Sequence, residues 1–271
     1  MTRRKVHFTE TKATLLLTLY GKALESKLPD SALKDTYAAA AVAQIDYDFE
    51  KLKLKRDAMI GLAMRASMID GWTRAFLASQ PEATVVHLGC GLDSRVFRVD
   101  PPPTARWFDV DFPDVVALRR EVYPARDHYE LVGTSVTELG WIEALPSDKP
   151  ALIVGEGLLP YLEPDKGIAL LRKLVAHFPS GEMAFDVYSN LGVKTLTYQP
   201  SIRATGARLG WGIDDVNELV RAVPGLRLLD EVEAYDPEQV ARMGRVKSAI
   251  VRLMLKVPAL RKMGRLVRFQ F

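Results

Sequence analysis

The chain has 271 residues, of which 48% are hydrophobic and 26% are charged, and its formal net charge is +3. This composition is typical of a globular protein and too apolar for a disordered chain. The single cysteine, Cys90, excludes a disulfide framework, and the four scattered histidines predict that no metal is bound. The sequence has no signal peptide and no apolar run of the roughly 18–20 residues that a membrane span requires, so we expect a cytoplasmic protein.

The C-terminal part of the chain is basic: nine lysines and arginines but only two acidic residues follow position 235. Such a tail can bind nucleic acid or an anionic membrane. Apolar residues recur among these charges at helical spacing, which favours a helix packed on the domain with a solvated basic face. These apolar residues are Val246, Ile250, Val251, Leu253 and Met254. We therefore expect no nucleic-acid partner.

The first 80 residues have a helical pattern. Two long helices are predicted, at 30–45 and 50–77, in a stretch that has few glycines or prolines and no strand signal. This pattern predicts a helical cap over 1–80 that joins the rest of the chain directly.

From residue 84 onward, short apolar and β-branched runs alternate with longer amphipathic runs. The clearest helix starts at Pro164 and carries an apolar stripe from Ile168 to Phe178. A second helix is predicted at 214–223, where the first residues are acidic. The predicted strands are 84–88, 106–111, 129–132, 151–155, 182–188, 226–232 and 266–271.

This alternation predicts an α/β fold with a seven-stranded, mostly parallel sheet, helices on both of its faces, and room for an antiparallel pair at one edge. The stretch 189–211 is longer than a normal connection between a strand and a helix, so it predicts a lid or a mobile loop. We expect one domain over 1–271. Its parts are the cap at 1–80, a core at 81–188, the lid insertion at 189–211, and the remaining core and C-terminal helices at 212–271.

The first predicted strand runs into a glycine-containing loop at 89–94, with the sequence GCGLDS. Glycines there permit a tight turn and a close approach of a nucleotide-type ligand to backbone N–H groups. About twenty residues later the second strand ends with Asp109 and Asp111, where a carboxylate can accept hydrogen bonds from both ribose hydroxyls. Two alternatives to a nucleotide site stay open. In the first, the glycines form an ordinary turn that binds no ligand. In the second, one of the aspartates caps the helix that begins near Pro113 and does not bind a ribose.

Other motifs narrow the kind of nucleotide. Ser94 stands where a dinucleotide fingerprint requires a third glycine, and no Walker lysine follows the loop. Neither Tyr161 nor Tyr188 has a lysine four residues further on, as hydride-transfer enzymes of one common type do. What remains is an adenosine ligand without a pyrophosphate, which suits S-adenosylmethionine.

Three ordered motifs carry a family resemblance: VVHLGCGLDSR at 85–95, WFDVDFP at 107–113 and GEGLLPYL at 155–162. They resemble the core motifs of the leucine carboxyl methyltransferase family, and its bacterial polyketide O-methyltransferase branch most closely. The resemblance extends over about residues 11–271 and is specific for the family but not for a substrate. It implies a class I, Rossmann-like methyltransferase fold with S-adenosylmethionine as the cofactor.

The resemblance also implies roles for residues of the sheet domain. Gly89 matches the glycine of the family's cofactor loop, which here also contains Gly91 and Asp93. Asp111 matches the acid that binds the ribose. These four residues are therefore expected to bind the cofactor.

Further cofactor contacts come from the other motifs. Glu156 matches the family glutamate beside the methionyl part of the cofactor, and Arg65 resembles the arginine from the helical cap that holds the methionine carboxylate. Ser135 and Val136 stand where eukaryotic members have an Asp-Leu pair at the adenine, so Ser135 is the remaining hydrogen-bonding side chain there. Lys22 lies in the cap, but the local alignment is too loose to assign it.

Whether methyl transfer needs a general base depends on the chemical group that accepts the methyl. A carboxylate is already ionised near neutral pH, so its methylation needs only alignment and exclusion of water. A phenol, with a pKa near 10, benefits from a base. Tyr161 and His177 are the catalytic candidates for such roles, His128 is a further histidine, and no base is assigned.

The side chains of 189–211 suit a hydrophobic or polycyclic small molecule; they include Leu196, Tyr198, Leu209 and Trp211. We therefore expect an S-adenosylmethionine-dependent O-methyltransferase whose acceptor is a small molecule, a carboxylate or phenol of a polyketide-like or other secondary metabolite. The alternatives are a protein that binds S-adenosylmethionine without methyl transfer, a protein C-terminal carboxyl methyltransferase, and a nucleic-acid binder that uses the basic tail.

Overall fold

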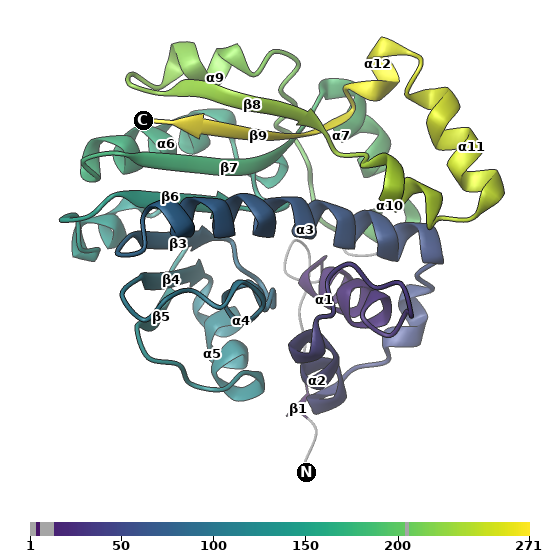
Figure 1. Cartoon of the computed structure of the whole chain (residues 1–271), viewed down its shortest axis with the longest axis horizontal. Helices are drawn as coiled ribbons and strands as arrows, with labels where there is room; N and C mark the ends of the chain where they lie inside the picture. Colours follow the sequence, from purple (N-terminus) through teal and green to yellow (C-terminus); the bar gives the residue numbers. More distant parts are fainter. Residues whose placement is uncertain (1–3, 6–13, 204–205) are drawn as a thin grey trace.

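The centre of the molecule is a seven-stranded sheet with the strand order β5-β4-β3-β6-β7-β9-β8 (Figure 1). The computed structural model describes residues 4–5, 14–203 and 206–271. Neighbouring strands from β5 to β7 are parallel, whereas β9 is antiparallel to both β7 and β8. The strands are β3 (Thr84–Leu88), β4 (Arg106–Asp111), β5 (Tyr129–Gly133), β6 (Ala151–Gly155), β7 (Gly181–Tyr188), β8 (Arg227–Glu233) and β9 (Gly264–Gln270).

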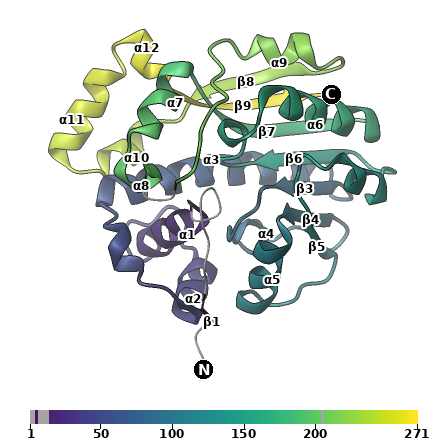
Figure 2. The same cartoon turned by 180° about the vertical axis from the view of Figure 1, so that it is seen from behind.

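Helices cover both faces of this sheet (Figures 1 and 2). The longer helices are α1 (Thr14–Glu25), α2 (Thr36–Gln44), α3 (Arg56–Ser79), α5 (Pro113–Val122), α6 (Pro164–His177), α7 (Asn190–Thr197) and α11 (Arg245–Met254). The shorter ones are α4 (Arg95–Val99), α8 (Pro200–Arg203), α9 (Asn217–Ala222), α10 (Pro237–Ala241) and α12 (Pro258–Arg261), with 3-10 turns η2 (Phe49–Leu52), η3 (Leu139–Ala144) and η4 (Leu159–Tyr161). The α/β architecture, its seven strands and its antiparallel edge are as predicted.

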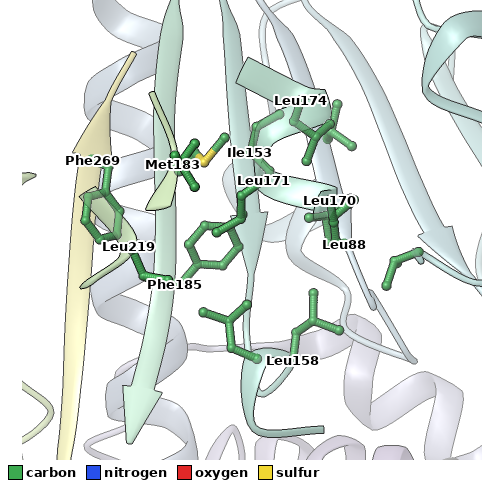
Figure 3. Close-up of a cluster of buried hydrophobic side chains, with 14 of the residues drawn as sticks. Leu88, Ile153, Leu158, Leu170, Leu171, Leu174, Met183, Phe185, Leu219 and Phe269 are labelled. Carbon is green, nitrogen blue, oxygen red and sulfur yellow. The ribbon is translucent and has the colours of Figure 1, made fainter. Parts of the chain in front are cut away.

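Alternate side chains of each strand build the two layers of the core, because successive residues of a strand point to opposite faces. On one face Val85 and Leu152 pack with residues of α3 and α4. On the other face Ile153 and Phe185 pack with the leucines of α6, as Figure 3 shows. The layer against α6 is apolar, whereas the layer against α3 and α4 also buries the polar side chains of His87, Arg95 and Asp109. Close packing on both faces makes the sheet a rigid base for the loops that leave its edges.

The N-terminal segment is the expected helical cap, with its own small core. Leucines of α1 and alanines of α2 pack against α5, and this cluster includes Leu92 of the glycine loop. One feature differs from the prediction. Residues Arg4–Lys5 (β1) and Ile45–Asp46 (β2) form a short parallel pair, although no strand was expected in 1–80.

Two cap helices begin later than their periodicity predicts. Helix α2 begins at Thr36 because the side chain of Asp35 accepts a hydrogen bond from the N–H of Ala38, which caps the helix there. Helix α3 begins at Arg56 because Lys53 adopts a left-handed conformation, with φ of 45°, that separates it from η2.

The stretch 189–211 is more ordered than predicted, because it contains helices α7 and α8. Ser189 starts α7 by accepting a hydrogen bond from the N–H of Gly192. Trp211 was expected in the lid, but it is buried in the core against Gly167. A Cβ atom on Gly167 would lie 2.0 Å from this indole, so the glycine makes room for the tryptophan.

The C-terminal basic helix also differs from the prediction. We expected α11 to bury its apolar residues on the domain, yet Val246 is 75% exposed and Leu253 is 66% exposed. The side of α11 that faces the protein carries Ser248, whose hydroxyl donates to the carbonyl of Val240. Periodicity identified an amphipathic helix but could not identify which of its faces packs. Within the described residues, no helix combines the length and apolarity that a membrane span needs.

Candidate active site

The loop after β3 has the tight geometry that its glycines predict. Gly89 and Gly91 have φ angles of 57° and 51°, in the left-handed region that favours glycine. A Cβ atom on Gly89 would lie 2.9 Å from Cδ1 of Leu158, so the position has no room for a side chain. Arg119 of α5 holds the loop in place, because its guanidinium donates to the carbonyl oxygens of Gly91 and Asp93 at 2.9 and 2.8 Å.

The two aspartates at the end of β4 have different surroundings. Asp109 is fully buried and pairs with Arg119, and Tyr129 donates to it at 2.7 Å. Burial alone would raise the pKa of Asp109, but Arg119 and His87 outweigh it and lower the pKa to about 2. Asp109 is therefore a structural ion-pair partner rather than a ligand group.

Asp111, in contrast, is half-buried at the edge of the sheet. Its Oδ2 accepts from the N–H of Gly91 and its Oδ1 from the N–H of Phe112, both at 2.7 Å. Each carboxylate oxygen has capacity for a further hydrogen bond. Burial raises the pKa of Asp111, although the two backbone N–H groups oppose this rise. Phe112 precedes the first helical residue, so this contact orients the carboxylate without capping an N–H group inside α5.

Glu156 follows β6 and lies among three cations. Its Oε1 is 3.1 Å from Nζ of Lys22 and 3.2 Å from Nη2 of Arg65, and its Oε2 accepts from Arg95. Burial by itself would raise the pKa of Glu156, but these cations outweigh it and lower the pKa to about 2. Glu156 is therefore ionised near neutral pH.

Asp93, in the glycine loop, binds an overlapping set of cations. Its Oδ2 is 3.0 Å from Nζ of Lys22 and 3.4 Å from Nη2 of Arg95, and its Oδ1 is 2.5 Å from Nη1 of Arg98. Burial opposes ionisation, but Arg98, Lys22 and Arg95 hold the pKa of Asp93 well below its usual range.

Arg65 reaches the site from α3 in the cap. It donates to Glu156 at 3.2 Å, to Asp186 of β7 at 3.0 Å and to the hydroxyl of Tyr188 at 3.1 Å. Asp186 in turn accepts from the N–H of Gly157 at 2.6 Å, which fixes the turn that presents Glu156. The side chain of Arg65 remains 13% exposed.

These contacts form one connected set of buried ion pairs, which we call the charge network. It consists of Lys22, Asp35, Arg65, Asp70, Asp93, Arg95, Arg98, Glu156 and Asp186. Four of its members are basic and five are acidic, so acidic side chains outnumber basic ones by one. The cap contributes Lys22, Asp35, Arg65 and Asp70, and the sheet domain contributes the others from two loops, α4 and β7. Cap and sheet therefore share one electrostatic unit.

The two residues predicted to lie at the adenine, Ser135 and Val136, have different surroundings. The hydroxyl of Ser135 lies 2.9 Å from that of Thr137 and is half-buried. Val136 is buried in the apolar core on the α6 face of the sheet. Both follow β5, at the same edge of the sheet as Asp111.

The two catalytic candidates, Tyr161 and His177, lie at opposite edges of the sheet. Tyr161, in η4 close behind Glu156, is half-buried, and burial raises its pKa although a hydrogen bond with Thr14 opposes the rise. His177 ends α6, where its ring packs on Phe178 and its Nε2 lies 3.0 Å from the carbonyl of Leu145. Because α6 starts near the carboxyl ends of the strands and runs back along the sheet, His177 lies at the opposite edge. His128, which directly precedes β5, lies at that same edge, so the fold places both histidines away from the glycine loop and Glu156.

Several members of the charge network were not predicted from the sequence. The strongest missed signal is Lys22, which is buried within the largely apolar helix α1. A lysine three residues after Leu19 on a buried stripe needs an anionic partner. Asp70, Arg98 and Asp186 had no comparable signal, because their partners are distant in the sequence. Among the described residues, no group of three or more His, Cys, Asp or Glu side chains has an arrangement that can hold a metal ion.

The fold and the glycine loop define the class of protein as the Rossmann-like, class I methyltransferases. A Thermobifida fusca protein assigned as a methyltransferase has this fold, with a TM-score of 0.59 at 16% identity over 97% of this chain and 95% of that chain. The sequence profile described as leucine carboxyl methyltransferase matches residues 16–175. The chain belongs to the leucine carboxyl methyltransferase family.

Two relatives are similar over nearly their whole length. The tetracenomycin polyketide synthesis O-methyltransferase TcmP of Streptomyces glaucescens is 40% identical over 266 residues, which is 98% of this chain and 98% of that protein. The S-adenosyl-L-methionine-dependent methyltransferase dpfgK of Gibberella zeae is 34% identical over 89% of this chain and 87% of that protein. The resemblance seen in the sequence motifs is thereby confirmed.

Proposed function

We propose that the protein is an S-adenosylmethionine-dependent O-methyltransferase that acts on a small molecule. The observation that carries this proposal is the charge network, in which acidic residues outnumber basic ones by one at the end of the glycine loop. S-adenosylmethionine carries a sulfonium, an ammonium and a carboxylate, and so has one net positive charge. The network therefore fits this cofactor in both sign and zwitterionic character.

The parts of the cofactor suit different members of the site. Lys22 and Arg65 are the basic groups proposed to bind the methionyl carboxylate, while Glu156 and Asp93 are proposed to accept from the ammonium. Hydrogen bonds between ionised partners are about twice as strong as neutral ones, which suits a site that must replace water around a zwitterion. When bound, the cofactor supplies an electrophilic methyl group.

The adenosine part suits the glycine loop and the sheet edge. Gly89 and Gly91 keep the loop free of side chains, and Asp111 is proposed to accept from the ribose hydroxyls. Ser135, with Val136 beside it in the core, is proposed to lie at the adenine.

The acceptor is proposed to be a carboxylate. The site acids Glu156 and Asp93 are held ionised by cations, and their lowered pKa makes them poor bases. Burial raises the pKa of Tyr161 and Tyr188, so these phenols stay protonated near neutral pH. An acceptor that arrives already ionised needs no proton removed. Catalysis then consists of aligning its oxygen with the methyl group and excluding water.

The acceptor is further proposed to be apolar and polyketide-like. The relative with 40% identity is named for tetracenomycin polyketide synthesis, and Tyr198 and Leu191 in the stretch 189–211 expose large apolar side chains. We propose that this stretch, with the cap, forms a lid over the acceptor, and that the protein is cytoplasmic.

Mass spectrometry tests the function directly. The protein is incubated with cofactor that carries a trideuterated methyl group and with polycyclic aromatic acids, matching phenols, and peptides with a free C-terminal leucine. The proposal predicts a labelled methyl ester of an aromatic acid. Cofactor binding without any transfer would favour a binding protein, and labelled peptide would favour a protein carboxyl methyltransferase.

A further inference from the structure

Helix α11 presents an apolar stripe to solvent, the reverse of the usual orientation of a surface helix. Val246, Ile250, Leu253 and Val257 are 75%, 47%, 66% and 46% exposed. Successive residues of a helix are rotated by about 100°, so Val246, Ile250 and Leu253 lie in one row along the axis of α11, and Val257 follows in the turn between α11 and α12. Ser248 lies on the opposite side and is buried against the protein.

Basic side chains border this stripe on both sides. By the same rotation, Arg245 and Arg252 fall on one border and Lys247 on the other, Lys256 lies in the turn that follows α11, and all four are exposed. The sequence contains no acidic residue from 239 to 271. Long basic side chains beside an apolar row are able to bury their methylene groups while their charges stay in a polar layer.

A second basic segment, distant in the sequence, lies next to α11. Lys51, Lys53, Lys55 and Arg56 are exposed at the start of α3. Nζ of Lys247 is 3.0 Å from Oδ2 of Asp57, and Figures 1 and 2 both show α11 beside this end of α3.

The acidic groups near these bases are mostly paired. Asp30 pairs with Arg56, Asp48 with Lys51 and Asp57 with Lys247, while Glu50 is exposed. The combined surface of α11 and residues 51–56 is therefore basic around an aliphatic row.

We propose that this surface docks on an anionic lipid bilayer. The aliphatic row of α11 enters the boundary between headgroups and acyl chains, and the lysines and arginines bind the anionic headgroups. A second copy of the chain fits less well, because a self-complementary contact over the row would bring like charges together. An acidic protein would need a groove matched to the row, whereas a bilayer accepts it without a specific shape.

Docking would also orient the carboxyl edge of the sheet. Helices α10, α11 and α12 follow β8, which ends at the same edge as β3 and β6. If the proposed function holds, an apolar acceptor dissolved in the bilayer is then close to the site. Vesicle binding itself requires neither cofactor nor acceptor, so its failure and the failure of methyl transfer are distinguishable.

Vesicle co-sedimentation tests the proposal with the full chain. We expect binding to phosphatidylcholine vesicles that contain phosphatidylserine, weakened by salt, and little binding to pure phosphatidylcholine. Arg252→Gln with Lys256→Gln should weaken binding by about fivefold for each charge removed. Leu253→Asn should also weaken it, whereas Leu229→Asn, at a leucine on β8 that is 41% exposed, should not.

Four outcomes overturn the proposal. The first is no binding to either kind of vesicle, and the second is vesicle binding that the α11 variants leave unchanged. The third is self-association, seen by sedimentation velocity, that Leu253→Asn abolishes in the absence of vesicle binding. The fourth is binding to polyglutamate or duplex DNA, but not to vesicles, that the charge variants weaken. Circular dichroism and the affinity for S-adenosylhomocysteine verify that each variant is folded.

Discussion

The Nζ atom of Lys22, on α1 of the cap, lies 3.1 Å from Oε1 of Glu156, in the loop after β6. Both side chains are buried, with 3% and 4% exposure. A buried charge is costly unless it is paired, so the cap and the sheet loop stabilise each other through this contact. The same pair lies at the centre of the proposed methionyl site, which couples cap docking to cofactor binding.

Replacing Lys22 should therefore affect stability and binding together. Lys22→Met leaves Glu156 and Asp93 with one partner fewer, and loss of one member of a buried pair costs about 3–5 kcal/mol. Denaturant unfolding should show a loss of this size. Lys173→Met is the matched control, because its salt bridge to Glu143 is exposed to solvent and its loss should leave the stability nearly unchanged.

The two aspartates of β4 should respond oppositely to the same change. Asp111→Asn keeps one of the two oxygens that accept from the N–H groups of Gly91 and Phe112 and replaces the other with an NH2 group that cannot accept. The affinity for S-adenosylhomocysteine should therefore fall by about tenfold or more, and the lost backbone hydrogen bond should cost about 1–3 kcal/mol of stability. Asp109→Asn leaves Arg119 buried without its anion and should destabilise the fold by about 3–5 kcal/mol. Calorimetry and thermal unfolding on both variants separate the two roles. Unchanged affinity in folded Asp111→Asn would remove the ribose assignment.

Gly89→Ala should impair the loop. A left-handed φ costs a residue with a Cβ about 1–2 kcal/mol, and the new methyl group would also meet Leu158. Gly61→Ala, inside α3 where nothing lies within 4 Å, should instead stabilise the protein by up to about 1 kcal/mol. The comparison is made by denaturant unfolding, and a neutral Gly89→Ala would contradict the strained geometry.

The stability of the protein should fall in acid because the pKa values of Glu156 and Asp109 are both lowered to about 2 by folding. A carboxyl with a depressed folded-state pKa stabilises the fold above its unfolded pKa of roughly 4, and this contribution disappears as the pH falls towards 2. The free energy of unfolding should therefore be flat above about pH 5 and decrease below it. In Glu156→Gln the free energy of unfolding should decrease less steeply below about pH 5. An unchanged decrease would contradict the lowered pKa of Glu156.

If the stretch 189–211 is a lid, a substitution in it should impair the binding of the acceptor but not the binding of the cofactor. Tyr198→Ser removes a ring that is 67% exposed and should raise KM for the acceptor while leaving the affinity for S-adenosylhomocysteine unchanged. The steady-state parameters and a binding titration are measured on the same preparation. Loss of cofactor affinity alone would make the stretch 189–211 a support of the cofactor site instead of a lid.

The sequence predicted the sheet well because its strands carry strong local signals. Residues 84–88 and 151–155 are short apolar runs bounded by glycine or proline, and the structure has strands with the same bounds. Helix starts in the cap were predicted too early, because the cap at Asp35 and the left-handed Lys53 are single-residue events that periodicity does not register.

The site was predicted only in part for a physical reason. Glycines and acids at strand ends follow a local pattern, so the tight turn at Gly89 and the place of Asp111 at the end of β4 were predicted. Arg98 and Asp186 act through partners that the fold brings together, and no local pattern reports such pairs. Trp211 was placed in the lid because composition does not indicate the complementary space that Gly167 leaves.

The most direct test compares two ligands by calorimetry: S-adenosylhomocysteine and methylthioadenosine, which lacks the amino-acid part. If the charge network binds the methionyl group, the native protein prefers S-adenosylhomocysteine, and Arg65→Met reduces that preference while the affinity for methylthioadenosine stays the same. Asp111→Asn should weaken the binding of both ligands. Equal weakening of both ligands by Arg65→Met, or no weakening of either, would contradict the account.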